Sequence, residues 1–176
     1  MLWFLMSMAV AAAPIEGARD FDAVSGYRVS HYRALVPAPP EGVRRIDVHE
    51  ALALSRQGML FVDVTPAEGG RRDEVTGQWV LAGEHSTIPG ARWFPEAGRG
   101  WLESATEAWF LGGVARLSQH RQNRPIVVFC LADCWMSWNA ALRLRRAGHR
   151  DVLWFGEGID GWREMGLQLT KGRPED

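Results

Sequence analysis

PIVVFCLADCWMSWNAALRLRRAG, residues 125–148, is the stretch of sequence that decides the fold. Its first part, Pro125–Phe129, is a short continuous apolar run, typical of a strand that is buried on both faces of a parallel sheet. Its last part, Ser137–Ala147, has the pattern of a strong helix, with Ser137 as the candidate N-cap and Gly148 as the stop. The stretch therefore predicts a buried strand, a short loop and a helix, in that order.

The same alternation of strand and helix continues on both sides of this stretch. Two further apolar runs, Met59–Val64 and Asp151–Phe155, predict buried strands. Helical spacing of apolar residues is found in three other segments, which are Asp47–Leu54, Thr106–Ser118 and Ile159–Gly166. A long polar loop, Thr65–Thr87, precedes the short apolar run Ala91–Phe94. Strands that alternate with helices predict an α/β fold, a mostly parallel sheet with helices on both faces.

Composition excludes several classes of protein. The chain has 176 residues, of which 47% are hydrophobic, with a net charge of −1 and two cysteines. These values exclude a disordered chain, a collagen-like repeat and a disulfide-dense small protein. Near-zero net charge argues against a nucleic-acid partner or an anionic membrane surface. The length fits a single domain, which we place at residues 41–171, with a C-terminal tail at 172–176.

The N-terminus predicts the compartment. Met1–Ala13 is an uncharged apolar run that ends in small residues, and it is shorter than the roughly 20 residues of a membrane span. We interpret residues 1–12 as a secretory signal peptide and 13–40 as an N-terminal extension, packed on the outside or partly mobile. The alternative is a buried N-terminal helix or strand. Export predicts a periplasmic protein with no membrane span, in a compartment where disulfides persist.

The two cysteines form the candidate site. Cys130 follows the predicted strand, and sites of open α/β sheets form at the carboxyl ends of strands. Backbone N–H groups of the loop and of the following helix are expected to stabilise its thiolate and to lower its pKa from about 8.5. Cys130 is thus the candidate nucleophile and Cys134 the resolving thiol. The remaining residues of this active-site loop are Leu131, Ala132, Asp133, Trp135, Met136 and Ser137.

Alternatives to a catalytic pair remain open from the residues alone. A strand-end cysteine can be a small buried hydrophobe, and in an exported protein the pair can form a structural disulfide. A metal site is not expected, because there are only two cysteines and the five histidines are scattered. The sequence has no nucleotide-binding glycine loop and no haem-attachment motif, so we expect no cofactor.

Several segments resemble those of a known family. In chain order they are Asp63-Val64, His85-Ser-Thr-Ile-Pro-Gly-Ala91, Val127-Val-Phe-Cys130 and Gly156-Glu-Gly-Ile-Asp-Gly-Trp162. Together they resemble a rhodanese-like domain. More closely, the run Phe129–Ala141 with the tail Gly158–Trp162 is similar to the PQQ-dependent catabolism-associated CXXCW motif proteins. These are exported rhodanese relatives encoded near quinoprotein alcohol dehydrogenases.

The resemblance implies a role for Cys130 and a set of partners. Cys130 would hold the position of the cysteine that carries a sulfane sulfur, and a small thiol or sulfane-sulfur donor would be its substrate. A quinoprotein dehydrogenase or its cytochrome c would be the protein partner. The loop departs from the family, because it has neither the usual glycine nor the usual arginine that contacts an anionic donor. Asp133 would instead repel thiosulfate.

The chain is rich in tryptophan, with nine residues of this type. Trp135 and Trp138 flank the loop and would either contact a substrate or partner or fill a groove. Trp93, Trp154 and Trp162 are expected in the core. Tryptophans on the long connections, which would cover the site or a docking patch, are Trp79, Trp101 and Trp109.

Two functional hypotheses follow. The first is an exported enzyme that performs sulfur transfer or thiol–disulfide exchange at Cys130, with Cys134 resolving. The second is a non-catalytic accessory module of a quinoprotein system, in which Cys130–Cys134 is a permanent disulfide.

Overall fold

The structure is a computed structural model that describes residues 20–176. The predicted signal peptide, residues 1–12, and residues 13–19 of the predicted extension lie outside the described residues.

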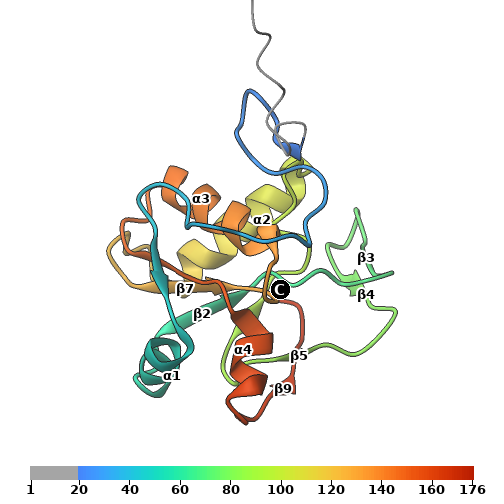
Figure 1. The fold of residues 1–176 in the computed structure, drawn as a ribbon. Helices are drawn as coiled ribbons and strands as arrows, with labels where there is room; N and C mark the ends of the chain where they lie inside the picture. The colour runs from blue at the N-terminus through green and yellow to red at the C-terminus, as the bar shows by residue number, and fades with distance from the viewer. Residues whose placement is uncertain (1–19) are drawn as a thin grey trace, which may run out of the picture.

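A five-stranded parallel sheet forms the centre of the fold, as predicted (Figure 1). The strand order is β1-β8-β7-β2-β6. The three inner strands are the predicted apolar runs, and all their residues are buried: β2 (Leu60–Asp63), β7 (Ile126–Phe129) and β8 (Val152–Phe155). The edges are β1 (Arg44–Ile46) and β6 (Arg92–Trp93).

Helices cover both faces of the sheet (Figure 1). Helices α2 (Ser104–Leu117) and α3 (Trp135–Arg146) lie on one face, and α1 (Val48–Arg56) and α4 (Gly158–Glu164) lie on the other. Side chains of β7 alternate between the two cores. Ile126, Val128 and Cys130 face α2 and α3, and Val127 and Phe129 face α1 and α4.

Local interactions explain where α1 begins and how closely α2 packs on the core. Asp47 caps α1, because its carboxylate accepts a hydrogen bond of 2.9 Å from the Glu50 N–H. Two consecutive glycines, Gly112 and Gly113, lie within α2 and do not interrupt the helix. A side chain at Gly113 would place its Cβ 2.6 Å from the Phe94 ring, so the glycine allows α2 to pack closely on the core.

The beginning of α3 corrects the sequence prediction. Ser137 is not the N-cap, because the helix starts at Trp135 and Cys134 holds the cap position. The reason is a contact distant in sequence. The Trp135 N–H donates to the carbonyl of Tyr32 at 2.8 Å, so the N-terminal extension supplies an acceptor for the first residue of a helix that begins two residues before Ser137. The Ser137 hydroxyl lies in the first turn and donates to the Cys134 carbonyl.

The long polar loop contains short antiparallel pairs. Strands β3 (Arg71–Arg72) and β4 (Trp79–Val80) pair with each other. Strand β5 (Ser86–Thr87) pairs with β9 (Thr170–Lys171) near the C-terminus. Within the described residues, no helix is long and apolar enough to span a membrane.

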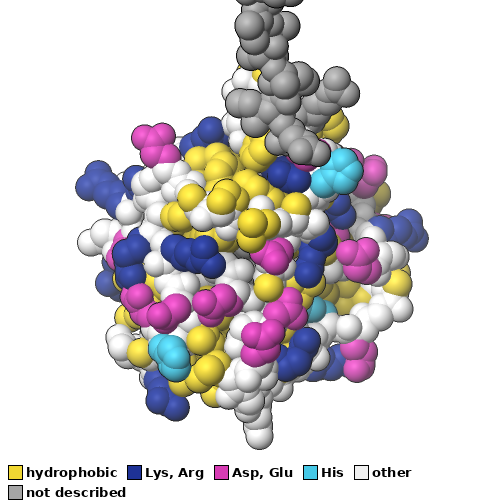
Figure 2. Space-filling model, viewed as in Figure 1, with side chains coloured by type: hydrophobic (Ala, Val, Ile, Leu, Met, Phe, Trp, Pro, Cys, Tyr) yellow, Lys and Arg dark blue, Asp and Glu magenta, His cyan; other side chains and the backbone are white. Residues whose placement is uncertain are grey.

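The described part of the extension, residues 20–40, packs on α3. The side chain of Asn139 is fully buried and exchanges two hydrogen bonds with the backbone of Arg28, at 2.9 and 2.8 Å. The segment then crosses α3 (Figure 1). Figure 2 shows a gathering of hydrophobic side chains on this face, where the extension crosses α3. The extension is therefore an integral layer over the helix that follows the cysteine loop.

Candidate active site

Cys130 stands at the carboxyl end of β7, and its side chain is fully buried. Its sulfur lies 3.6 Å from the carbonyl oxygen of Leu131 and 3.5 Å from that of Cys134. Carbonyl oxygens accept a hydrogen bond from a thiol and repel a thiolate. Cys130 is therefore placed at the strand end, as predicted, in surroundings that favour its protonated form.

Cys134 opens onto a cavity of about 460 Å³, which we call the cysteine cavity. Its lining comes from the extension, from the loop after β2 and from the cysteine loop, and includes Tyr32, Arg33, Pro66, Arg99, Leu131 and Met136. Cys130 is not among the lining residues. Cys134 is itself only 2% exposed, and of the two cysteines it is the one that borders the cavity.

Acidity also distinguishes the two thiols. Burial raises the pKa of Cys130 well above its usual range, and the neighbouring Cys134 raises it further. A hydrogen bond from Cys130 lowers the pKa of Cys134 to about 7, against the effect of its own burial. The N–H of Met136 and the charge of Arg33 lower it as well. The expectation of a stabilised thiolate at Cys130 is therefore wrong: the hydrogen bond from Cys130, together with the Met136 N–H at the start of α3, stabilises a thiolate at Cys134 instead.

The loop between the cysteines is held from α4. The Ala132 N–H donates to the carboxylate of Asp160 at 3.0 Å, and the Ile159 N–H donates to the carbonyl of Cys130 at 2.8 Å. Gly158 permits this contact, since a Cβ there would lie 2.1 Å from the same carbonyl oxygen. The loop turns at Asp133, whose φ of 48° is left-handed, a conformation that Asp adopts more readily than most residues.

The extension holds the other side of the loop. Arg33 and Cys134 form an antiparallel bridge, flanked by the bond from Trp135 to Tyr32 and by one of 3.0 Å from the Ala34 N–H to the Asp133 carbonyl. Asp133 is exposed and does not line the cysteine cavity. The position of Cys134 thus depends on residues more than ninety positions away in the sequence.

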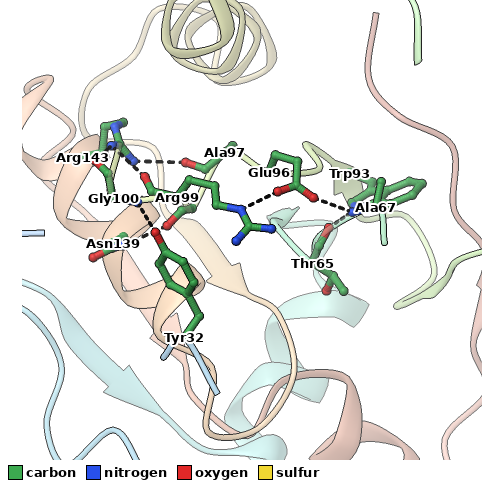
Figure 3. A network of polar contacts seen from close by, with 11 residues as sticks. Tyr32, Thr65, Ala67, Trp93, Glu96, Ala97, Arg99, Gly100, Asn139 and Arg143 are labelled. Atoms are coloured by element: carbon green, nitrogen blue, oxygen red, sulfur yellow. Dashed lines mark hydrogen bonds and ion pairs between the residues drawn. The ribbon is translucent and has the colours of Figure 1, made fainter. Parts of the chain in front are cut away.

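A polar network stiffens the far wall of the cavity (Figure 3). Arg99 pairs with Glu96 at 2.6 Å and lies over the ring of Tyr32. The Tyr32 hydroxyl accepts a hydrogen bond of 3.0 Å from the Gly100 N–H. Buried Arg143 of α3 donates to the carbonyls of this turn, including that of Arg99 at 3.1 Å. The wall is therefore tied to the same helix that carries Cys134 at its start.

Trp135 and Trp138 do not line the cavity. Trp135 is buried beneath the extension, with the Phe21 ring 5.2 Å away and the Arg28 guanidinium 4.7 Å over its face. Trp138 is half-buried and donates its indole N–H to the carbonyl of Ala38. In this arrangement both rings anchor the extension. A partner contact at Trp138 stays a prediction.

The other tryptophans fall into two groups. The prediction of core positions is confirmed for Trp93, Trp154 and Trp162, which are all buried. Trp109 lies in α2, where it packs on Phe94 and Trp79. Trp101 is exposed. None of these last three tryptophans lines the cysteine cavity.

A second cavity of about 410 Å³ adjoins the first and shares Pro66, Glu68 and Leu131 with it. His85 lines this second cavity and pairs with buried Asp63 at 2.7 Å. Over residues 20–176, no group of three or more His, Cys, Asp or Glu side chains is arranged to hold a metal ion.

The parallel sheet, with helices on both faces and a cysteine loop between a central strand and a helix, defines an α/β domain. A family model described as "Rhodanese-like domain" matches residues 47–165, and the chain belongs to this family. The search of curated proteins found no match.

Several solved structures are similar to this chain. A thiosulfate sulfurtransferase from Pseudomonas aeruginosa is 19% identical with a TM-score of 0.50, and the match covers 76% of this chain but only 21% of that one. A 3-mercaptopyruvate sulfotransferase from Escherichia coli is 18% identical with a TM-score of 0.48, over 76% of this chain and 53% of that one. A polysulfide-sulfur transferase from Wolinella succinogenes is 16% identical with a TM-score of 0.46, over 73% and 79% of the two chains. At these identities the likeness concerns the fold.

Some residues of the site were not predicted from the sequence. The cavity walls contributed by His31, Tyr32, Arg33 and Arg99 lie far from the cysteines in sequence and carry no local pattern. Asp160, which holds the loop, lies in the quoted segment Gly156–Trp162, but its partner Ala132 is visible only in the folded chain. These contacts are products of the tertiary structure.

Proposed function

We propose that this rhodanese-like domain breaks sulfur–sulfur bonds with its cysteine pair, in which Cys134 attacks and Cys130 resolves. The observation that carries the proposal is the unequal placement of the two sulfurs: Cys134 lines the cavity, and Cys130 is fully buried behind it. The acidity of the thiols supports the same order. The roles are thus the reverse of those expected from the sequence.

The first step uses the thiolate of Cys134. It attacks one sulfur of a substrate R–S–S–R′, so that a Cys134–S–S–R bond forms and the substrate bond breaks. The group R′S⁻ leaves and takes a proton from water. A thiol with a pKa near the ambient pH is well suited to this attack, because it combines a large thiolate fraction with good nucleophilicity.

The second step uses Cys130. In the reduced pair, Cys134 raises the pKa of Cys130 through its hydrogen bond and its charge. This effect ends once Cys134 is held in the mixed disulfide, and the Ser137 N–H and hydroxyl then stabilise a thiolate at Cys130. Cys130 attacks the sulfur of Cys134, its proton passes to the departing RS⁻, and an internal disulfide closes. The substrate gains two electrons and the pair loses two, so an external dithiol reductant must restore the enzyme.

Single-cysteine variants test the proposed function. The reduced C130S variant, mixed with 2-hydroxyethyl disulfide, is expected to accumulate a stable adduct on Cys134, visible by mass spectrometry. The C134S variant is expected to form little adduct, since its remaining thiol does not line the cavity. The wild-type chain is expected to pass through the adduct to an internal disulfide. Rapid adduct formation on Cys130 in C134S, with none on Cys134 in C130S, would refute the proposed order.

A redox titration separates catalysis from a permanent disulfide clip. If the pair only clips the loop, as in the accessory-module hypothesis, its reduction potential lies below about −300 mV. A working pair is expected to have a higher potential. The loop is already held by Asp160 and by the bridge to Arg33 when both thiols are free, which favours a working pair.

We further propose that the protein is exported to the periplasm and serves PQQ-dependent alcohol oxidation, next to a quinoprotein dehydrogenase or its cytochrome c. The apolar run Met1–Ala13 and the resemblance of Phe129–Ala141 to the CXXCW motif proteins support this proposal. Cell fractionation with N-terminal sequencing of the mature chain tests it. Recovery of the chain in the cytoplasm with Met1 still present would contradict it.

A further inference from the structure

The extension places a positive charge next to the attacking sulfur. Arg33 and Cys134 are the paired residues of an antiparallel bridge. The two hydrogen bonds of the bridge join their neighbours, Trp135 to Tyr32 and Ala34 to Asp133, which makes Arg33 and Cys134 a non-hydrogen-bonded pair. In such a pair the two side chains lie on the same face, with Cβ atoms about 4.5–5.5 Å apart. Both side chains line the cysteine cavity.

No carboxylate among the described residues forms an ion pair with Arg33, whereas the other arginine of the cavity, Arg99, pairs with Glu96. Glu68 is the carboxylate that lines the cavity, and His31 is held by Asp20. Arg33 is thus a cation beside a reactive sulfur, and its charge is available to a ligand.

The rest of the cavity indicates an organic ligand. Tyr32, Pro66, Leu131 and Met136 give it apolar walls. A volume of about 460 Å³ lies within the range of small-molecule sites and far exceeds the space that a bare oxyanion needs. The cysteine loop itself contains no arginine, and the family match begins at residue 47, after Arg33.

We infer that Arg33, supplied by the N-terminal extension, is the specificity-determining residue of the cysteine cavity and selects a small organic disulfide or persulfide that carries a carboxylate next to its sulfur. The reaction in this inference, cleavage of a sulfur–sulfur bond, rests on the proposed function. The preference for a negatively charged substrate rests on the position of Arg33 beside Cys134. The extension is then part of the active site, and an arginine outside the matched domain replaces the one that the loop lacks.

Two alkylating reagents of similar size test the charge preference without any turnover. The rate of alkylation of Cys134 by iodoacetate, divided by that by iodoacetamide, measures anion selectivity, because both reagents react with the same thiolate and its pKa cancels in the ratio. In R33Q the ratio is expected to fall about five-fold. R33K is expected to retain most of it. R71Q, which removes an exposed arginine that lines neither cavity near the cysteines, is expected to leave it unchanged.

The same variants, reacted with disulfides, test the substrate class. Dithiodiglycolate carries two carboxylates, and 2-hydroxyethyl disulfide is a neutral compound of similar size. The reduced wild-type chain is expected to prefer dithiodiglycolate, and R33Q is expected to lose that preference. Oxidation of the pair by thiosulfate but not by dithiodiglycolate would overturn the assigned class.

The outcomes separate the inference from the proposed function. An iodoacetate ratio that is equal in R33Q and the wild type, or that falls as much in R71Q, would overturn the role of Arg33. Failure of both disulfides to react with Cys134 would instead refute the proposed function, and the alkylation ratio would still report on Arg33. Circular dichroism of each variant shows that the compared chains are folded.

Discussion

The hydrogen bond from Cys130 to Cys134 allows us to predict how the pKa of Cys134 changes when the Cys130 thiol is removed. The pKa of Cys134 is lowered from 9.0 to about 7, and this hydrogen bond is the largest cause. A lowering of this size favours the thiolate over the thiol by roughly 3 kcal/mol. At pH 7 about half of Cys134 is then thiolate, compared with about three parts in a hundred for an ordinary thiol whose pKa is about 8.5.

Removing the thiol of Cys130 is expected to undo part of this shift. In C130A the N–H of Met136 and the charge of Arg33 remain, so we expect the pKa of Cys134 to rise by about one unit. The thiolate fraction at pH 7 then falls about five-fold. In C130S the hydroxyl can still donate, and most of the shift is expected to persist.

The assay is the rate of iodoacetamide alkylation as a function of pH, with the modified cysteine located by peptide mass spectrometry. The rate on Cys134 is expected to rise with pH through a midpoint near 7 in the wild type and near 8 in C130A. A wild-type midpoint near 9, or equal midpoints in the wild type and C130A, would refute the reasoning. So would faster alkylation of Cys130 than of Cys134.

Two further predictions concern the supports of the site. N139A removes three buried hydrogen bonds, two to Arg28 and one of 2.9 Å to the Gly98 carbonyl, and is expected to lower the free energy of unfolding by about 3–5 kcal/mol in urea titration. A loss under about 1 kcal/mol would show that the extension contributes little. G158A drives a Cβ against the Cys130 carbonyl and is expected to cost about 3 kcal/mol or more, whereas G166A, with φ of 71° and free space around it, is expected to cost about 1 kcal/mol. Equal losses in the two glycine variants would contradict the close packing of α4 on the loop.

The centre of the fold is predictable from sequence because its signals are local. Three apolar runs became β2, β7 and β8, and the helical spacing of Asp47–Leu54 became α1. Strand β1 was not predicted, since two of its three residues are exposed arginines at a sheet edge and give neither an apolar run nor an alternation. Strand β1 forms because it pairs with β8, which lies more than a hundred residues later in the sequence.

The site was predictable in part, and the rest depends on contacts distant in sequence. Both cysteines were identified from the strand–loop–helix order. Their difference in acidity was not, because the hydrogen bond from Cys130 and the N–H of Met136 favour a thiolate at Cys134, and burial opposes one at Cys130. Ser137 failed as a cap for a similar reason, since Tyr32 supplies the acceptor. No local pattern marks Arg33 as a neighbour of Cys134.

The most direct test of the central claim is to observe which cysteine first carries the substrate sulfur in the native pair. The fully reduced wild-type chain is mixed with less than one equivalent of dithiodiglycolate, quenched in acid within milliseconds, and mapped by peptide mass spectrometry. The account predicts that the first adduct lies on Cys134 and decays as the Cys130–Cys134 disulfide appears. A first adduct on Cys130 would contradict it.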